Sequence, residues 1–255
     1  MTRRKRSTAT PKPRPAQEGP FPYADYVQAR DDLQAALDSG PFYAVLSGAS
    51  GTGKSSLLHE LAGSADAHRY QAIYLSSSRA NVTNLARFLA YSLRVAPCRS
   101  HLETVQAFTN ALRSQPAHLV VQVDEADRVE AEALQELRVL AECDPSGKQL
   151  FSVILSGLPA VLGLLDSPQL FPLKRRLTVR ATLSGLRREE LEPFLLHRFG
   201  GVDAERVPAG VCDELFERTQ GTPGLVEAAL RFPLARTKGK LTADQVRAGL
   251  DPLGL

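Results

Sequence analysis

The sequence has few cysteines and lacks any long hydrophobic run. Its three cysteines, Cys98, Cys143 and Cys212, are odd in number, scattered, and without the spacing of metal ligands. They therefore predict no disulfide framework and no cysteine-based metal site, and they indicate reduced thiols in the cytosol. No apolar run approaches the roughly 18 to 20 residues of a membrane span, and the basic N-terminus lacks the apolar stretch of a signal peptide. We expect a soluble, cytoplasmic protein that has no membrane partner.

The opening segment also lacks carboxylates. Residues 3–14 contain six of the 31 basic residues of the chain and none of its 28 acidic residues, so the net charge of +3 becomes −3 outside this segment. Prolines recur up to position 22, and almost no apolar residue precedes Phe21. This composition predicts a disordered tail at residues 1–20. The tail is either an electrostatic arm for a polyanion such as DNA or a solubilising terminus, and the sequence leaves both open.

A G-x-x-x-x-G-K-S motif begins at Gly48, directly after the apolar run 42–46. Its glycines lack a Cβ, so the loop can turn its backbone N–H groups inward and form an anion site at a helix N-terminus. Lys54 then reaches the β- and γ-phosphates of a nucleotide, and the Ser55 hydroxyl ligates Mg²⁺. A chance Gly/Ser-rich turn would lack the strand before the loop and the helix-forming segment 55–62 after it. We predict a nucleotide site made by Gly48, Ser50, Gly51, Thr52, Gly53, Lys54, Ser55 and Ser56.

Two carboxylates, Asp124 and Glu125, follow the nearly continuous apolar run 119–123. Such a run is typical of a strand that is buried on both faces. In a P-loop protein the first carboxylate holds Mg²⁺, and the second polarises the water that attacks the γ-phosphate. We therefore expect Asp124 to be a metal residue and Glu125 to be catalytic. The alternative is an acidic N-cap for a helix at 128–143, a role that we assign to Asp127.

Strand and helix patterns alternate as far as residue 183, after which the strand patterns stop. This order predicts an α/β P-loop core with a parallel sheet at residues 21–184, followed by a small helical lid domain at residues 185–255. Ser156 ends the fourth strand and is the only polar candidate there to lie beside the γ-phosphate. The expected strands are 42–46, 70–75, 119–123, 151–157 and 178–183. The expected helices are 23–37, 55–62, 81–93, 102–112, 128–143, 191–199, 209–220, 223–232 and 242–249, with Thr242 as the last N-cap.

Five segments together resemble the AAA+ ATPases grouped around ExeA of general secretion and TniB, TnsC and MuB of transposition: Gly48–Ser55, Asp124-Glu125-Ala126, Gly157-Leu158-Pro159, Leu173-Lys174-Arg175-Arg176-Leu177 and Gly221-Thr222-Pro223. The resemblance runs from about Tyr23 to the C-terminus. It implies an αβα core with a helical lid, ATP and Mg²⁺ as cofactors, and a homo-oligomer, either a ring or a helical filament, with ATP at the subunit junctions.

In this group a cation from the neighbouring subunit completes each site. The resemblance implies that Arg176 is this arginine finger, with Arg175 as the second choice; the alternative is a solvated basic loop. Two positions depart from the group's pattern. Gly224 stands where ExeA-like lids have an arginine, and Leu158 stands where relatives commonly have a polar residue. We therefore expect hydrolysis that is slow or depends on a partner.

ExeA-type proteins carry a membrane span downstream, whereas this chain ends at Leu255, which favours a cytosolic transposition helper. The resemblance then implies polymerisation on duplex DNA without sequence specificity, and recruitment of a transposase or integrase. Relatives place DNA contacts after the second strand, which here indicates Ser77, Ser78, Arg79, Asn81 and Thr83. The alternative for these residues is an ordinary polar loop in which Asn81 starts a helix. The alternative for the whole protein is an ExeA-like secretion or assembly ATPase that binds no DNA. A helicase is excluded because the chain has room for one nucleotide-binding core.

Overall fold

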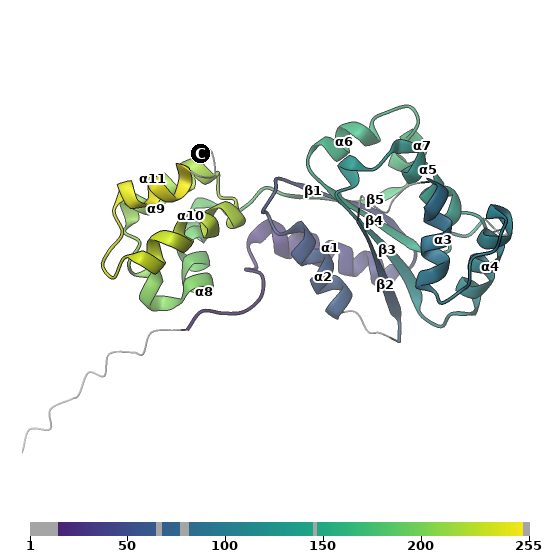
Figure 1. Ribbon diagram of the computed structural model, residues 1–255, viewed down its shortest axis with the longest axis horizontal. Helices are drawn as coiled ribbons and strands as arrows, with labels where there is room; N and C mark the ends of the chain where they lie inside the picture. Colours follow the sequence, from purple (N-terminus) through teal and green to yellow (C-terminus); the bar gives the residue numbers. More distant parts are fainter. Residues whose placement is uncertain (1–14, 65–67, 77–81, 145–146, 252–255) are drawn as a thin grey trace, which may run out of the picture. The chain divides into compact units, whose positions relative to one another are not determined.

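The computed structural model describes residues 15–64, 68–76, 82–144 and 147–251 (Figure 1). The chain divides into two compact units. Residues 22–185 form the P-loop unit, and residues 186–251 together with 15–21 form the lid unit. Most of the expected tail, residues 1–14, lies outside the described residues.

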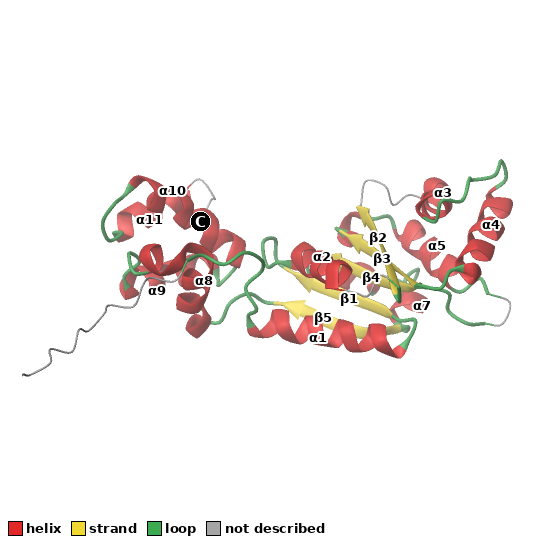
Figure 2. Ribbon diagram, turned by 90° about the horizontal axis from the view of Figure 1, so that it is seen from below, coloured by secondary structure: helices red, strands yellow, loops and turns green. Residues whose placement is uncertain are grey.

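Five strands in the P-loop unit form one sheet in which every neighbouring pair is parallel (Figure 2). The order across the sheet is β2-β3-β4-β1-β5. Since all five strands run the same way, the ends of β1, β3 and β4 meet at one edge, where parallel α/β sheets bind ligands. The α/β fold expected from the sequence is confirmed. The strands are β1 (Tyr43–Gly48), β2 (Tyr70–Ser76), β3 (His118–Asp124), β4 (Ser152–Gly157) and β5 (Leu177–Leu183).

Helices cover both faces of the sheet. Helices α1 (Ala24–Ser39) and α2 (Lys54–Ser64) lie on one face, where the amide of Gln122 on β3 donates to the carbonyl of Leu58 at 3.1 Å. A hydrophobic core lies on the other face, where alternate strand residues such as Val121 pack with the helices that follow β2 and β3. Strands buried on both sides account for the nearly continuous apolar runs of β1, β3 and β4. The helices of this core include α3 (Val82–Ser92), α4 (His101–Ser114) and α5 (Ala131–Ala141).

The segments after β3 and β4 differ from the sequence analysis in two ways. The helix expected from Arg128 begins only at Ala131, because the 3₁₀ helix η2 (Ala126–Arg128) comes first, Val129 is extended and Glu130 is the non-helical N-cap residue. Two short helices, α6 (Ala160–Leu165) and α7 (Phe171–Lys174), were not expected at all. Each is too short for helical periodicity to be visible between the surrounding glycine, proline and serine residues.

The lid unit is helical, as the end of the strand patterns indicates. Thr242 caps its last helix, since its hydroxyl accepts from the Gln245 amide at 3.4 Å and the Gln245 side chain accepts from the Thr242 amide at 3.1 Å. Among the described residues, no helix combines the length and apolar character that a membrane crossing requires. The helices are η3 (Arg188–Glu190), α8 (Leu191–Ala204), α9 (Ala209–Thr219), α10 (Pro223–Arg236) and α11 (Ala243–Leu250).

Candidate nucleotide-binding site

The glycine-rich loop joins the end of β1 to the start of α2, at the sheet edge where β3 and β4 also end. Gly51 and Gly53 have φ values of 84° and 100°, a left-handed backbone region that side chains disfavour. Gly48 has no room for a side chain, because a Cβ there would lie 2.6 Å from the carbonyl oxygen of Leu183. Thr52 is buried and its hydroxyl donates to the carbonyl of Ala49 at 2.9 Å, which ties the loop across itself. Ser50 and Ser56 are exposed.

Lys54 lies at the mouth of this loop. Its ammonium group donates to the carbonyl oxygens of Gly48 at 2.8 Å and Ala49 at 2.9 Å. Burial lowers the pKa of Lys54, while the nearby carboxylates of Asp124 and Asp127 act in the opposite direction. An ammonium that has lost part of its hydration shell is favourably placed to bind an anion such as a phosphate.

Asp124, at the end of β3, is the centre of the polar group. Its Oδ2 accepts from the hydroxyls of Ser55 and Tyr74, both at 2.6 Å. Its Oδ1 accepts from the Glu125 amide at 2.9 Å and from the fully buried hydroxyl of Ser156 at 3.1 Å. The structure thus joins side chains from α2, β2, β3 and β4 at one carboxylate.

These partners keep Asp124 ionised. Burial raises the pKa of Asp124, but the hydrogen bonds from Ser55, Tyr74, the Glu125 amide and Ser156 outweigh burial, so the pKa lies below its usual value. A carboxylate and a hydroxyl side by side are oxygen ligands of the kind that Mg²⁺ prefers. The described residues contain no cluster of three or more His, Cys, Asp or Glu side chains that could hold a metal ion by themselves. The donor set therefore fits a Mg²⁺ ion that is shared with nucleotide phosphates, and Ser55 and Asp124 are the residues that would hold it.

Glu125 has an uncommon backbone conformation. Its φ of 52° and ψ of 40° place it in the left-handed region, which costs a non-glycine residue about 1 kcal/mol or more. This conformation accompanies the hydrogen bond from its amide to Asp124. Its carboxylate is exposed and lies 3.5 Å from the Arg128 guanidinium, in an ion pair that contributes little stability at such exposure. The side chain is therefore at the sheet edge and accessible to water.

Asp127 does not have the helix-capping role that we expected. Its Oδ1 accepts from the backbone amide of Leu158 at 2.8 Å, and α5 begins without any side-chain cap. The 3₁₀ turn explains this difference, since it separates Asp127 from the start of α5 and directs its side chain to the loop after β4. A Cβ on Gly157 would lie 2.6 Å from the same carboxylate oxygen, so a side chain there would displace the carboxylate.

Arg175 and Arg176 lie at the opposite end of the strands. Leu177 pairs with Tyr43 at the start of β1, whereas Leu183 pairs with Gly48 at the glycine-rich loop. The six residue steps from Leu177 to Leu183 correspond to about 20 Å along the strand. Arg176 forms an ion pair with Glu142, and the Arg175 guanidinium lies 5.8 Å from the centre of the Phe171 ring. The structure therefore does not bring either arginine to the nucleotide loop of its own chain.

Tyr74 was not expected in this site. It lies on β2, two residues before the strand ends, and the sequence pattern identifies it only as a strand residue. Burial raises the pKa of Tyr74 to about 12, and the hydrogen bond to Asp124 adds to this effect. The signal that could have located it is the register of β2 and β3, which pairs Tyr74 with Gln122 and Ser76 with Asp124.

The expected DNA contacts fall largely outside the described part of the chain. Ser77, Ser78, Arg79 and Asn81 lie outside the described residues, and Thr83 belongs to the first turn of α3. The described surface that follows them is the outer face of α3, which exposes Arg87 and Tyr91, and Arg94 just beyond its end.

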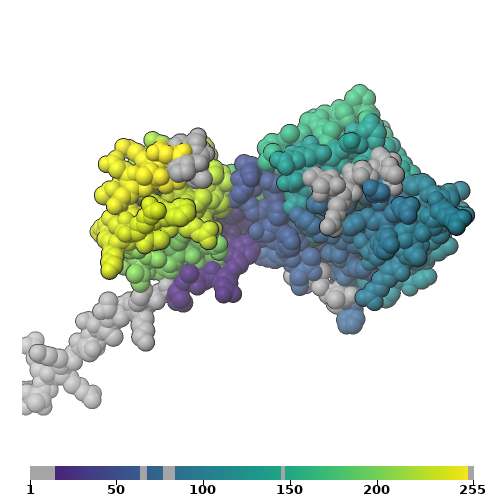
Figure 3. All heavy atoms as spheres, viewed as in Figure 1, coloured from purple at the N-terminus to yellow at the C-terminus, as the bar shows by residue number. Residues whose placement is uncertain are grey.

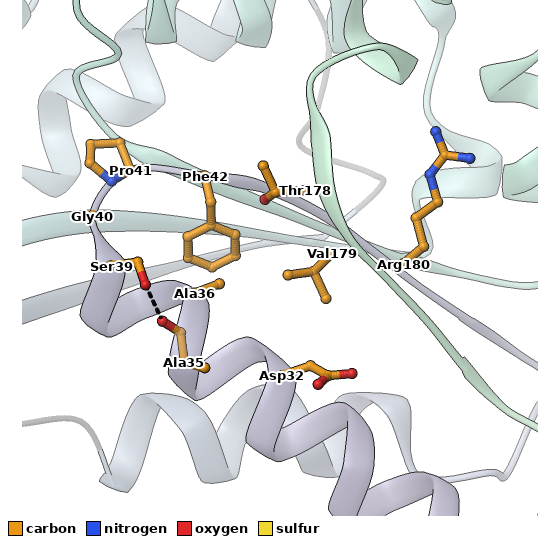
Figure 4. Close-up of a pocket in the computed structure, with 10 residues that line it drawn as sticks. All are labelled: Asp32, Ala35, Ala36, Ser39, Gly40, Pro41, Phe42, Thr178, Val179 and Arg180. Atoms are coloured by element: carbon orange, nitrogen blue, oxygen red, sulfur yellow. Dashed lines mark hydrogen bonds between the residues drawn. The ribbon is translucent and has the colours of Figure 1, made fainter.

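A separate groove of about 570 Å³ lies between α1 and β5 (Figure 4). Phe42, Ala36 and Val179 line it, with Asp32 on the helix and Arg180 on the strand. It lies where β1 and β5 begin and contains none of the expected nucleotide-site residues. We therefore do not assign the nucleotide to it.

Comparison with known proteins identifies the fold. Residues 39–165, about half of the chain, match the family described as AAA domain, and the curated proteins give no match. Cdc6p from Pyrobaculum aerophilum is 18% identical with a TM-score of 0.68, over 96% of this chain and 69% of that one. The ORC1 protein of Aeropyrum pernix, solved in complex with DNA, is 18% identical with a TM-score of 0.62, over 93% of this chain and 66% of that one. A RuvB variant from Thermotoga maritima is 19% identical with a TM-score of 0.56, over 89% of this chain and 69% of that one.

The chain spans 66% of the length of another similar structure, the ORC2 protein of Aeropyrum pernix in ADPNP and ADP complexes. At 17–19% identity these likenesses establish the fold, and about a third of each relative has no counterpart here. The glycine-rich loop and the carboxylate at the end of β3 both fall within the segment that matches the family. Residues 39–165 therefore resemble an AAA domain, and the chain has the α/β P-loop fold of the AAA+ ATPases.

Proposed function

We propose that this chain is a cytoplasmic ATPase that binds ATP with Mg²⁺, assembles in several copies on duplex DNA, and regulates target selection and transposase or integrase recruitment in DNA transposition. Gly48, Ser50, Gly51, Thr52, Gly53, Lys54, Ser55, Ser56 and Ser156 bind the nucleotide. Ser55 and Asp124 hold the metal ion, and Glu125 activates the attacking water. Arg176, or Arg175 in its place, serves the site of the next copy.

The polar group around Asp124 supports the nucleotide part of the proposal. A phosphate-binding loop, a lysine at its mouth, a hydroxyl and an ionised carboxylate converge at one sheet edge, as phosphoryl transfer requires. Glu125 lies next to this group with an accessible carboxylate. In this scheme the chain supplies the phosphate clamp and the general base, while Mg²⁺ supplies charge neutralisation between the phosphates when it is bound.

One observation carries the DNA part of the proposal. Residues 67–102 contain five arginines and not one aspartate or glutamate, although Asp and Glu make up 28 residues of the chain. Within this stretch the outer face of α3 presents Arg87 together with Tyr91, which is 70% exposed. Exposed guanidinium groups beside an aromatic ring are typical of surfaces that bind the nucleic-acid backbone. The segment 82–114 forms the outer surface of the P-loop unit on the right of Figure 3.

The position of Arg176 supports assembly. At about 20 Å along the strand from its own glycine-rich loop, its guanidinium can reach a γ-phosphate only in another copy. A contact of this head-to-tail kind generates rings or helical filaments rather than closed pairs. The transposition role itself rests on the likeness of the five sequence segments to the ExeA, TniB, TnsC and MuB group.

Electron microscopy with duplex DNA and a slowly hydrolysed ATP analogue tests the proposal. We expect rings or filaments on DNA for the wild type, none for Lys54→Ala, and longer-lived assemblies for Glu125→Gln, which keeps ATP but cannot activate water. Lys148→Ala, at an exposed lysine remote from the glycine-rich loop in sequence, is the matched control for Lys54→Ala.

A protein that stays monomeric with nucleotide and duplex both saturating would contradict the proposal. Hydrolysis of ATP together with no shift of DNA mobility would instead favour a secretion or assembly ATPase that binds no DNA. The two outcomes separate the nucleotide part of the proposal from the DNA part.

A further inference from the structure

Tyr74 contacts the candidate metal site and has no role in the function proposed above. Its hydroxyl donates to Oδ2 of Asp124 at 2.6 Å, the same oxygen that accepts from Ser55. Two donors on one carboxylate oxygen at this distance are charge-assisted hydrogen bonds, which are about twice as strong as neutral ones. The contact joins side chains of two neighbouring strands, β2 and β3, so it is separate from the backbone hydrogen bonds that pair these strands.

The packing of Tyr74 indicates a polar role and not a core role. Its neighbours Ile73 and Leu75 are buried on one face of the sheet, whereas Tyr74 lies on the face of α2 and is 41% exposed. Its ring lies 5.3 Å from that of His59, and the His59 Nδ1 lies 2.6 Å from the carbonyl oxygen of Ser55. The helix turn that carries Ser55 therefore holds the ring in place while the hydroxyl reaches the carboxylate.

We propose that Tyr74 is a positioning residue of the metal and nucleotide site, an inference that rests on the proposed function. Ser156 and the Glu125 amide fix Oδ1 of Asp124, and Tyr74 fixes Oδ2 independently of Ser55. The phenol therefore keeps the plane of the carboxylate constant when the Ser55 hydroxyl takes part in binding the cation. Partners of this kind, which hold a ligand without touching the metal, commonly change metal affinity by about 10- to 100-fold when removed.

The same strand offers a matched control. Tyr70 lies four residues before Tyr74, and its hydroxyl donates to the Leu37 carbonyl at 3.2 Å and to Asp38 at 3.1 Å. Tyr70→Phe thus removes a phenol hydroxyl that also donates to an aspartate from β2, at the end of the strand remote from Asp124. Any effect that reflects only the stability of β2 should appear in both variants.

Binding of Mn²⁺ in the presence of ADP, followed by electron paramagnetic resonance, tests the inference without measuring hydrolysis. We expect Tyr74→Phe to weaken Mn²⁺ binding by about 10- to 100-fold. We expect its ADP affinity in EDTA to match that of the wild type. Tyr70→Phe should bind Mn²⁺ as the wild type does.

Equal Mn²⁺ affinity in Tyr74→Phe and the wild type, tighter binding in Tyr74→Phe, or equal weakening in both tyrosine variants would overturn the inference. In each of these cases the proposed function stands, because the wild type binds Mn²⁺ with ADP. A wild type that binds no Mn²⁺ with ADP overturns the proposed function, and this inference with it.

Discussion

Mixing Arg176→Ala with Glu125→Gln in equal amounts should restore ATP hydrolysis that neither variant has alone. Glu125→Gln lacks the general base but keeps its arginine, and Arg176→Ala lacks the arginine but keeps its general base. If Arg176 acts on the site of the next copy, a junction between the two variants can contain both intact groups. Lys54→Ala is unsuitable as a partner, because we expect it to prevent assembly.

The position of Arg176 determines how much ATP hydrolysis the mixture should regain. Because about 20 Å of strand separates it from its own glycine-rich loop, no rotamer can bring its guanidinium to its own γ-phosphate. An arginine finger accelerates phosphoryl transfer by about 10³- to 10⁵-fold, so Arg176→Ala should be almost inactive. Glu125→Gln should also be almost inactive, because a general base contributes about 10²- to 10⁴-fold. With random mixing in a head-to-tail assembly, about a quarter of the junctions pair an intact Glu125 with an intact Arg176. We therefore expect the mixture to regain about a quarter of the wild-type rate.

Phosphate release with saturating Mg·ATP and duplex DNA measures this recovery. Arg175→Ala, mixed in the same way, determines which of the two arginines is the finger. Arg180→Ala is a control from the same region, since Arg180 is exposed on β5 and donates to the Lys174 carbonyl at 3.3 Å. An Arg176→Ala protein with normal activity alone, or a mixture no more active than its two components, would refute the assignment.

Three further outcomes follow from the described contacts. The pKa of Asp124 is lowered in the folded protein, so the unfolded chain binds more protons than the folded chain as the pH falls below about 5. The free energy of unfolding should therefore fall as the pH falls in this range. Urea unfolding across a pH series should show a weaker dependence of this free energy on pH in Asp124→Asn. Gly157→Ala should destabilise the protein by about 1–3 kcal/mol, since its Cβ would displace the Asp127 carboxylate from the Leu158 amide. Urea unfolding measures this loss, and an unchanged unfolding midpoint would count against that contact. Arg87→Ala should weaken DNA binding for all sequences and reduce the slope of log K against log salt by about 1, whereas an unchanged slope would remove α3 from the DNA surface.

Much of the fold could be predicted because the signals are local. The runs 119–123 and 151–157 are mostly apolar, which indicates strands buried on both faces, and β3 and β4 lie there. The glycine-rich motif required a strand before it and a helix after it, and β1 and α2 supply them. The convergence of Ser55, Asp124 and Ser156 also follows from topology, because parallel strands end at one edge.

The remaining contacts depend on register and on turns that the sequence pattern does not specify. Tyr74 reaches Asp124 only because β2 and β3 pair with Ser76 opposite Asp124, and periodicity within one strand contains no information about its neighbour. Asp127 binds the Leu158 amide because a 3₁₀ turn replaces the expected start of the helix. The pairing of Arg176 with Glu142 joins residues 34 positions apart, which no local pattern can indicate.

Helix α5 connects the two halves of the proposed junction. Glu125 precedes it through the 3₁₀ turn, and Glu142 is its C-cap residue, which accepts from Arg138 at 2.7 Å and from Tyr43 at 3.0 Å and pairs with Arg176. The eleven residues of α5 span about 16 Å, and its inner face is buried in the core. Position between two sites does not by itself demonstrate coupling; that requires an element with two arrangements that both sites bias. The ion pair of Arg176 with Glu142 meets part of this requirement, because a γ-phosphate in the next copy would compete with Glu142 for the Arg176 guanidinium. When the γ-phosphate binds that guanidinium, Glu142 keeps Arg138 and Tyr43 as its partners.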